Sequence, residues 1–181
     1  MDVTSLLASL QEGVPDARPE VVSSRDSHAT IYVSREALPG VARTLRDRRD
    51  LRFEVLADLI AVDFWPREPR FELVYILVSI DHRERLRLKV RLPGDDARIE
   101  TVSTIWPAAN WLEREVWDLF GVVFDGHPDP RRLLMPEDWE GYPLRKDYPV
   151  QIKMPPTTGE PLQVTEEQFR ANLEKDRLSR R

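Results

Sequence analysis

Cysteine is absent from this 181-residue sequence, and histidine occurs only three times, at His28, His82 and His127. Without cysteine the chain can form no disulfide, no thiolate nucleophile and no cysteine-held zinc or iron–sulfur cluster. Three widely separated histidines argue against a multi-histidine metal site. The longest apolar run, Leu73–Val78, is far shorter than the roughly 20 residues that span a bilayer. These absences exclude several redox and metal-based chemistries on this chain.

The composition favours a globular protein that does not bind nucleic acid. Hydrophobic residues make up 41% and charged residues 33%, which in a chain of this length allows a buried core. The formal net charge is −5, whereas nucleic-acid-binding domains are usually basic. The first residues, Met1-Asp2-Val3, lack the basic region and apolar stretch of a signal peptide, so we expect a cytoplasmic location.

Hydrophobic periodicity predicts helices over residues 3–11, 34–49 and 111–120, and strands over 21–25, 30–34, 53–64, 71–80, 84–92 and 122–124. Ser34 and Asn110 are the expected N-caps of the second and third helices, and Gly121 is the expected end of the third. The run 71–80 is almost wholly apolar, which indicates a central strand covered on both faces. We therefore expect an α+β fold, a single domain with a mixed β-sheet flanked by helices.

Residues 84–92 alternate without error between apolar and charged side chains. Such period-two patterning is typical of a half-buried strand. The apolar set is Leu86, Leu88, Val90 and Leu92, and the basic set is Arg85, Arg87, Lys89 and Arg91. The basic row admits two interpretations, a solvated sheet face or a nucleic-acid module. The neighbouring Asp81 and Glu84 and the acidic chain favour the solvated face.

Prolines are concentrated after Asp125, and seven of them lie between residues 125 and 160. This enrichment is several-fold above the average of about 5% and predicts mostly irregular chain there. Thr165 and Gln168 form a capping-box pattern that indicates a short helix over 166–178. We therefore predict one domain over residues 1–150 and an extended C-terminal arm over residues 151–181.

The most specific pattern lies in Trp111–Val150, where a charge-dense helix precedes a long segment of turns, aromatic residues and arginines. Its motifs, in order, are Glu113-Arg114-Glu115, Asp118-Leu119-Phe120-Gly121, Gly126-His127-Pro128-Asp129, Arg131-Arg132, Pro136-Glu137-Asp138-Trp139-Glu140-Gly141 and Pro143-Leu144-Arg145-Lys146-Asp147-Tyr148-Pro149. These motifs and their spacing resemble one family in respiratory complex I, the proton-pumping NADH:quinone oxidoreductase, namely the peripheral-arm subunits designated C. Pro130 departs from that pattern, in which leucine is expected.

The resemblance implies a non-redox structural subunit in the peripheral arm of a proton-translocating NADH:quinone oxidoreductase. Such a subunit packs against the quinone-site subunits and supports electron transfer from NADH to quinone in the respiratory chain. It lies on the cytoplasmic side of the cell membrane as a peripheral protein. The resemblance also implies that FMN, iron–sulfur clusters and quinone belong to partner subunits, so we expect no cofactor on this chain and no catalysis by the chain in isolation.

The residues that the resemblance marks as partner-interface or family-signature positions belong to the motifs given above. They are Glu113, Arg114, Glu115, Asp118, Phe120, Gly121, His127, Pro128, Arg131, Arg132, Pro136, Trp139, Gly141, Arg145, Lys146 and Tyr148. Related subunits occur in membrane-bound hydrogenases and in photosynthetic-type relatives of complex I. The resemblance therefore leaves the electron donor open.

An enzymatic interpretation of the same residues stays open as an alternative. Glu115 and His127 can serve a stand-alone acid/base hydrolase, and together with Glu113 and Asp118 they can be read as a metal site. However, carboxylates two positions apart point to different sides of a helix, and one histidine is a poor ligand set. Structural ion pairs are therefore the favoured interpretation.

Arg131 and Arg132 likewise allow two roles. They can clamp a phosphate or an acidic partner, but pairing with the carboxylates of the preceding helix or with a partner subunit is favoured. His127, which precedes a proline, is most simply a turn residue bonded to backbone. The four tryptophans at positions 106, 111, 117 and 139 are expected to be core or interface anchors, not a platform for stacking bases.

We predict that deleting residues 161–181 weakens association with the complex while leaving the melting temperature of the domain nearly unchanged. The reason is that a short helix with few apolar residues is marginal alone and is stabilised by docking on another surface. Co-purification and thermal unfolding of the truncated chain measure the two effects separately. An equal loss of assembly and of melting temperature would contradict the docking-arm hypothesis.

Overall fold

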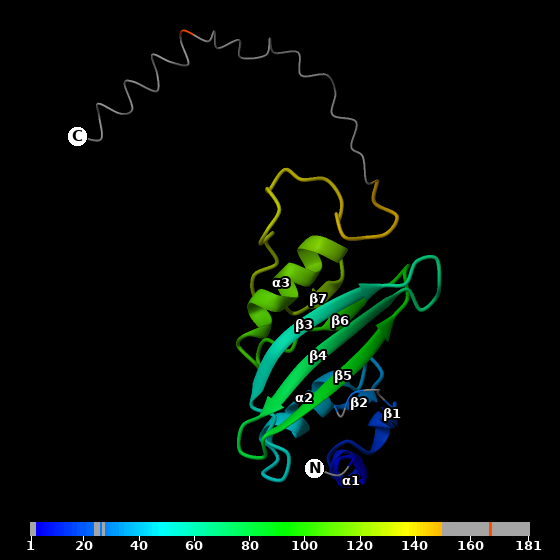
Figure 1. Cartoon of the computed structure of the whole chain (residues 1–181), viewed down its shortest axis with the longest axis vertical. Coiled ribbons are helices and arrows are strands. Elements are labelled where there is room, and N and C mark those ends of the chain that lie inside the picture. Colours follow the sequence, from blue (N-terminus) through cyan, green and yellow to red (C-terminus); the bar gives the residue numbers. More distant parts are fainter. Residues whose placement is uncertain (1–2, 24–25, 27, 150–166, 168–181) are drawn as a thin grey trace, which may run out of the picture. The chain divides into compact units, whose positions relative to one another are not determined.

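A mixed β-sheet organises the chain, with helices packed against one side of it (Figure 1). The computed structural model describes residues 3–23, 26, 28–149 and 167. In chain order the elements are α1 (Val3–Gly13), the 3₁₀ turn η1 (Pro15–Ala17), β1 (Glu20–Val21), β2 (Ala29–Tyr32), α2 (Leu38–Asp47), β3 (Val55–Asp63), β4 (Phe71–Ser79), β5 (Glu84–Leu92), β6 (Arg98–Glu100), α3 (Ala109–Phe120) and β7 (Val123–Asp125).

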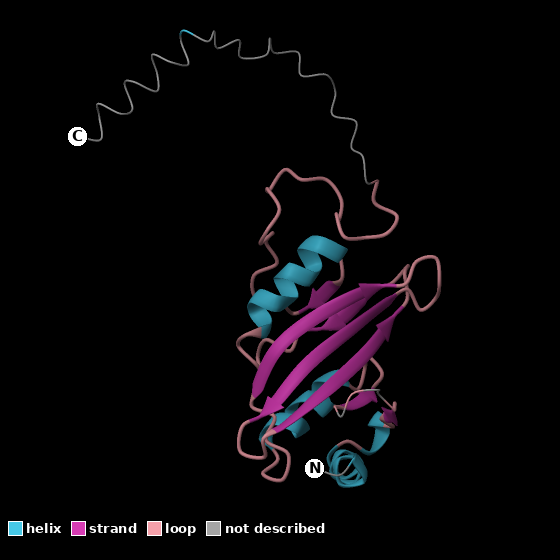
Figure 2. Ribbon diagram, in the orientation of Figure 1, coloured by secondary structure: helices cyan, strands magenta, loops and turns pink. Residues whose placement is uncertain are grey.

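The main sheet has the strand order β1-β2-β5-β4-β3, and β6 pairs with β7 separately. β2 runs parallel to β5, whereas every other neighbouring pair in the main sheet is antiparallel. The three longest strands, β3, β4 and β5, curve side by side through the middle of Figure 2. The predicted α+β fold, with a mixed sheet flanked by helices, is therefore confirmed.

The alternation in β5 separates two faces of the sheet, as predicted. Leu86, Leu88, Val90 and Leu92 are almost fully buried in the core, and the basic residues between them face the other way. Trp106 is also buried in this core, and its indole Nε1 donates to the backbone oxygen of Phe53 at 3.0 Å. The polar end of a buried tryptophan is thus satisfied without leaving the apolar layer.

The prediction that β4 is covered on both faces is confirmed for burial, since Glu72 and Val74 on the second face keep only 4% and 7% of their surface exposed, but no second layer of described helices provides that cover. Leu73, Tyr75 and Leu77 are fully buried against the helices. Val74 and Ile76 lie on the opposite face, outside the core cluster, and no described helix crosses that face in Figure 1. An apolar run cannot distinguish a strand buried under two layers from one whose second face is shielded only by neighbouring strands.

Two predicted N-caps are wrong. α2 begins at Leu38, after a turn in which the Ser34 hydroxyl accepts the backbone N–H of Ala37 at 3.3 Å, so Ser34 caps the turn. α3 begins at Ala109 with Ala108 at its N-cap, and Asn110 already lies inside the helix. There the tight turn formed by Trp106 and the residues after it leads into the helix without a side-chain cap.

The end of α3 agrees with its prediction. Gly121 has φ of +73°, and its N–H donates to the carbonyl of Trp117 at 2.8 Å. A side chain here would be strained, since a Cβ would also lie 2.5 Å from the ring of Tyr142. Residues 126–149 contain no helix or strand, which confirms the prediction drawn from the prolines for this part of the segment.

Smaller differences concern short elements. The strand expected over 21–25 is described only at Glu20–Val21, and β6 was not predicted because a single apolar residue between two charged residues gives no recognisable period. The described chain up to Tyr148 forms one compact unit, whereas the arm over 151–181 and its helix lie outside the described residues, apart from Glu167. Among the described helices, none is long and apolar enough to cross a membrane.

Candidate functional site

On helix α3 the side chains of Glu113, Arg114 and Asp118 point into the interior of the protein. Glu113 and Asp118 have no exposed surface and Arg114 retains 8%, whereas Glu115 lies exposed on another side of the helix. The helical period explains this division, because Arg114 and Asp118 are four positions apart and share a side, while Glu115 is two positions from Glu113. Buried charges require partners. Most of them come from the irregular chain of residues 126–148, which we call the long loop.

Asp118 is held by three consecutive backbone N–H groups of the long loop. Its Oδ2 accepts from Leu133 at 3.0 Å, Leu134 at 2.7 Å and Met135 at 2.9 Å. Its Oδ1 accepts from Nη1 of Arg132 at 2.7 Å. Burial alone would raise the pKa of this carboxyl, but these four donors hold the pKa below its ordinary value. Asp118 therefore stays ionised and fixes the backbone of the loop.

Arg132 connects α3 to a second part of the long loop. While Nη1 contacts Asp118, Nη2 donates to the carbonyls of Trp139 at 2.6 Å and Gly141 at 3.3 Å. The guanidinium also lies 5.7 Å from the ring centre of Trp117, within the range of a cation–π contact. The predicted pairing of an arginine in this segment with a helix carboxylate is therefore present for Arg132.

Arg114 fastens the same stretch from the helix side. Its Nε donates to the carbonyl of Arg131 at 3.0 Å and its Nη2 to the carbonyl of Arg132 at 2.9 Å, while Nη1 lies 3.2 Å from a carboxylate oxygen of Asp129. The Arg131 side chain itself is 74% exposed and bonds to Asp129, so it does not reach the helix carboxylates. The two adjacent arginines thus face different surroundings.

The C-terminus of α3 is capped by the loop. Arg145 donates through Nε to the carbonyl of Phe120 at 2.5 Å and through Nη2 to that of Gly121 at 3.4 Å, and Leu144 N–H donates to Leu119 at 3.1 Å. The last carbonyls of a helix have no partner within it, so these donors replace water. The guanidinium of Arg145 also lies over the Tyr142 ring at 4.6 Å.

A second buried carboxylate, Asp63 at the end of β3, ties the loop to the sheet. Arg70 makes two hydrogen bonds to it, Nε to Oδ1 at 3.0 Å and Nη2 to Oδ2 at 2.9 Å, and bonds also to Asp147 of the loop at 2.7 and 2.9 Å. The backbone N–H of Lys146 donates to Asp63 at 2.9 Å. Burial opposes ionisation of Asp63, but Arg70 and the backbone donors lower its pKa to about 2.

Two aromatic rings stack on each other near the end of the long loop. The rings of Trp139 and Tyr148 stack with centres 6.4 Å apart, and the Tyr148 hydroxyl donates to the carbonyl of Glu140 at 3.2 Å. Gly141 has φ of +81°, and a Cβ there would approach the Tyr148 ring to 2.8 Å. Glycine is therefore required at this position by both backbone conformation and space.

Glu113 differs from Asp118 in having no arginine. Its Oε1 accepts from the backbone N–H of Val102 at 2.8 Å and its Oε2 bonds to the Thr101 hydroxyl. These two neutral donors do not compensate for burial, which raises the pKa of Glu113 to about 7. The phenol of Tyr75 is buried close enough for the Glu113 charge to raise its pKa further. Near neutral pH the Glu113 carboxyl is therefore partly protonated.

His127 is a turn residue bonded to backbone, as predicted. Its Nδ1 accepts from the N–H of Asp129 at 3.1 Å, and its Nε2 donates to the carbonyl of Asn110 at 3.0 Å. A ring that accepts at one nitrogen and donates at the other is neutral. The 3.8 Å between Nε2 and Glu113 Oε2 is thus a close approach and not an ion pair. A cavity of about 40 Å³ beside them is lined also by Pro130.

The hydrolase alternative loses its geometric basis. Glu115 is exposed on another side of α3, while both nitrogens of His127 are engaged by backbone groups. The two do not form an acid–base pair. Within the described residues, no three side chains of histidine, aspartate or glutamate are grouped so as to hold a metal ion.

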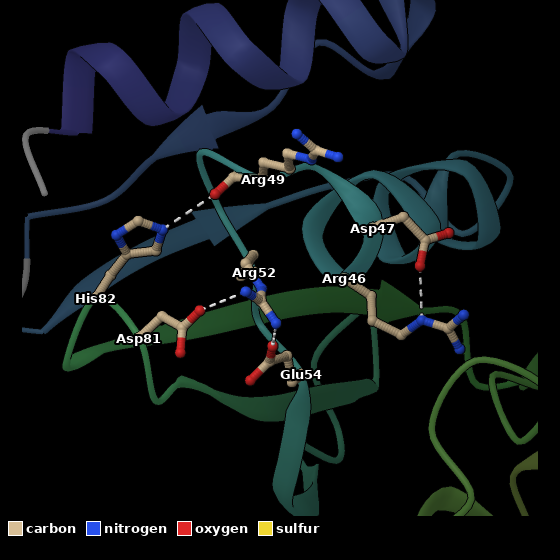
Figure 3. Close-up of a pocket in the computed structure, with 7 residues that line it drawn as sticks. All are labelled: Arg46, Asp47, Arg49, Arg52, Glu54, Asp81 and His82. Atoms are coloured by element: carbon tan, nitrogen blue, oxygen red, sulfur yellow. Dashed lines mark hydrogen bonds and ion pairs between the residues drawn. The ribbon is translucent and has the colours of Figure 1, made fainter.

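A separate pocket lies at the turn after α2 and has a volume of about 630 Å³. Figure 3 shows that its charges pair with one another: Arg46 contacts Asp47, and Arg52 contacts both Glu54 and Asp81. The Arg49 guanidinium points away from these groups, and its carbonyl is engaged by His82 at 3.3 Å. Each carboxylate of the pocket is thus paired with an arginine.

The remaining predicted residues shape the loop or face solvent. Pro128, Pro136 and the Lys146 side chain are exposed, and the carbonyl of Pro136 accepts from Trp139 N–H at 3.1 Å in a turn. The contact of the predicted residues with partner subunits stays a prediction. Sequence reasoning missed Asp63, Arg70 and Thr101, because no local pattern signals the bonds of Asp63 and Arg70 to the distant long loop or the bond of Thr101 to α3.

Comparisons with known proteins find a matching family, similar sequences and similar solved structures. Residues 31–153 match the family described as respiratory-chain NADH dehydrogenase, 30 kDa subunit. The NADH-quinone oxidoreductase subunit designated C from Roseiflexus sp. (strain RS-1) is 44% identical over 152 residues, 83% of this chain and 86% of the relative. The structure of a trypsin-resistant fragment (1–134) of Nqo5 is 32% identical and covers 71% of this chain and 99% of its own, with a TM-score of 0.59.

A second structural neighbour comes from the membrane-bound sulfane sulfur reductase, an archaeal respiratory membrane complex. It is 30% identical, covers 82% of this chain and 86% of its own, and has a TM-score of 0.69. The fold and these similarities are those of α+β subunits of respiratory complexes. The chain belongs to the family of the 30 kDa subunit of respiratory-chain NADH dehydrogenase, which is the subunit designated C in NADH-quinone oxidoreductases.

The buried state of Glu113 predicts a pH dependence of stability. Its pKa is higher in the folded chain, about 7, than the ordinary 4.5, so the stabilising effect of its proton is present below pH 4.5 and is lost as the pH rises through 7. Glutamine has no proton to lose, so only the wild type is destabilised as the pH rises. The unfolding free energy of Glu113→Gln minus that of the wild type should therefore increase by about 2 kcal/mol from pH 5 to pH 8. Chemical denaturation at several pH values measures this difference.

Glu115→Gln is the matched control, because it removes the same charge from the exposed side of α3. An equal pH-dependent gain in Glu115→Gln would show that the effect comes from overall charge. A flat difference between Glu113→Gln and the wild type would contradict the burial argument.

Proposed function

We propose that this chain is a structural subunit of a proton-translocating NADH:quinone oxidoreductase and that it carries no redox step itself. Its role is to hold the long loop in one conformation against α3 and the sheet, so that neighbouring subunits pack on a rigid surface. The observation that carries this proposal is the buried Asp118, because its three backbone donors and Arg132 fix the loop at several points. Geometry at electron-transfer sites is sensitive to such support.

Exposed groups on this braced region supply the surface for partners. Trp111 is 58% exposed, Leu134 60% and Leu144 52%, although their backbones lie in or beside hydrogen-bonded structure. Two basic side chains are also exposed there, Lys146 and Arg131, and the second of these pairs with Asp129. Rigid aromatic side chains are typical of interface hot spots, and exposed apolar groups rimmed by polar residues mark protein–protein contact sites. We assign this surface to contacts with the subunits that form the quinone site.

The cofactors and the location follow from the same proposal. FMN, iron–sulfur clusters and quinone would be held by partner subunits, and the chain would lie on the cytoplasmic side of the membrane as a peripheral component. The likeness to a sulfane sulfur reductase complex favours one second candidate, the equivalent subunit of a related membrane-bound respiratory complex. The two candidates differ in the electron donor and not in the role of this chain.

Purification of a tagged chain from detergent-solubilised membranes tests the proposal. We expect partner subunits, iron and flavin to accompany the chain, with NADH:quinone activity in the complex and none in the chain alone. Turnover or a bound prosthetic group in the purified single chain would contradict a purely structural role. A complex without flavin or NADH oxidation would favour the related-complex candidate.

Replacing the two adjacent arginines singly should separate internal bracing from partner contact. Arg132→Ala leaves the buried Asp118 without its cation, so the unfolding free energy should fall by about 3 kcal/mol. Arg131→Ala removes an exposed side chain, so the melting temperature should stay near that of the wild type while the share of chain in the complex falls. Denaturation curves and native gels measure the two quantities. A large loss of stability in Arg131→Ala would overturn the partner role.

A further inference from the structure

One face of the main sheet carries no described helix. The register places Ile60 of β3 opposite Val74 of β4, and Val74 opposite Lys89 of β5, so these side chains share a face. In Figure 1 this face is turned to the viewer, and no described helix crosses β3, β4 or β5 on it. We call it the open face. It lies on the other side of the sheet from the core that contains Leu73 and Leu88.

The half of the open face formed by β3 and β4 is mostly apolar. Ile60 is 43% exposed and Val55 37%, although both lie in a regular strand. Two carboxylates lie in this half: Asp58 accepts the backbone N–H of Leu59 at 2.8 Å, and Glu72 pairs with the neighbouring strand β5. Apolar side chains gathered on one sheet face are normally covered by another layer. The apolar residues of this half are Val55, Ile60, Val62, Val74, Ile76 and Val78.

The half formed by β5 is basic, through Arg85, Arg87, Lys89 and Arg91. Glu72 of β4 pairs with Lys89 at 2.8 Å and lies 3.7 Å from Arg91, while Asp26 pairs with Arg87. At one end of the row Arg85 is exposed, and at the other the Arg91 side chain is 53% exposed. The two exposed guanidinium groups are therefore the ones at the ends of the row.

The spacing of these two ends matches a helix. Arg85 and Arg91 are six positions apart on one strand, which corresponds to about 20 Å. An α-helix covers that length with about 13 residues. A helix laid along β4, between β3 and β5, can cover the apolar half with one side and reach both arginines of β5 with carboxylates near its two ends. Helix on sheet is an ordinary way to bury such a face.

We infer that the open face binds an amphipathic helix of a partner subunit, with its apolar side over Val55 and Ile60 and its carboxylates on Arg85 and Arg91. This inference rests on the proposed function, because it needs a multisubunit complex. A second copy of this chain fits less well, since its own open face would bring basic row against basic row. An anionic membrane is the other surface that an apolar and basic face could meet, and it is an outcome of the test.

Site-specific photo-crosslinking in the assembled complex tests the inference directly. A photoreactive phenylalanine analogue at position 60 should crosslink to a helical peptide of a partner subunit that carries carboxylates. The same analogue at position 80 is the matched control, because Ile80 is 63% exposed but lies in the turn after β4. A product with lipid, with a second copy of this chain, or with nothing in the assembled complex would overturn the inference.

Charge reversal supplies an independent measurement. Arg85→Glu should lower the share of chain recovered in the complex about tenfold, because it places a carboxylate against carboxylates. Arg43→Glu on the exposed side of α2 changes the net charge equally and should assemble like the wild type. Reversing the crosslinked partner's carboxylate to lysine should restore assembly of Arg85→Glu. Equal assembly of the Arg85→Glu and Arg43→Glu variants would overturn the inference.

Thermal unfolding of each full-length variant separates a docking defect from misfolding, and crosslinking at position 60 does not depend on charge reversal. Failure of the inference is distinguishable from failure of the proposed function. If the tagged wild-type chain recovers no redox subunits, the proposed function is wrong. If the complex assembles and neither position 60 nor Arg85 responds, only the docking of a helix on the open face is wrong.

Discussion

The burial of the Asp118 carboxylate is the constraint on which the ordered long loop depends. A carboxylate with no exposed surface is costly unless donors surround it, and this one accepts three backbone N–H groups and a guanidinium. Because all three backbone donors are consecutive residues, Leu133–Met135, satisfying one side chain fixes a stretch of main chain. A segment that forms no helix or strand thereby acquires a defined conformation.

Glu113 shows that burial alone does not decide the charge of a carboxyl group. It lies on the same helix as Asp118 and is equally inaccessible, yet its pKa is raised while that of Asp118 is lowered. The difference is the number and charge of the donors. Asp118 has a cation and three amides, whereas Glu113 has one amide and one hydroxyl. Helix α3 thus carries one carboxyl group that stays ionised, that of Asp118, and one that titrates near neutral pH, that of Glu113.

The compact unit offers two surfaces with different physical origins. The long loop is rigid because charged groups beneath it are paired with its backbone, and its exposed apolar groups project from that frame. The open face is rigid because it is a sheet, and its apolar and basic halves follow from the alternation of β4 and β5. A structural subunit in a large complex can bind partners through both surfaces, since each presents a fixed pattern of charged and apolar groups without a change in backbone conformation.

The sequence by itself determined the elements whose signal is local: the alternating strand β5, the end of α3 at Gly121, the irregular proline-rich segment and the motifs that identify the family. It did not reveal that Asp63 receives the backbone of Lys146, 83 positions away, or that Glu72 neutralises part of the basic row. Nor did it rank Glu113, Glu115 and Asp118 by burial. Those facts were decided by tertiary structure, because period and spacing act over a few residues, whereas the partner of a buried charge depends on which distant segments the fold brings together.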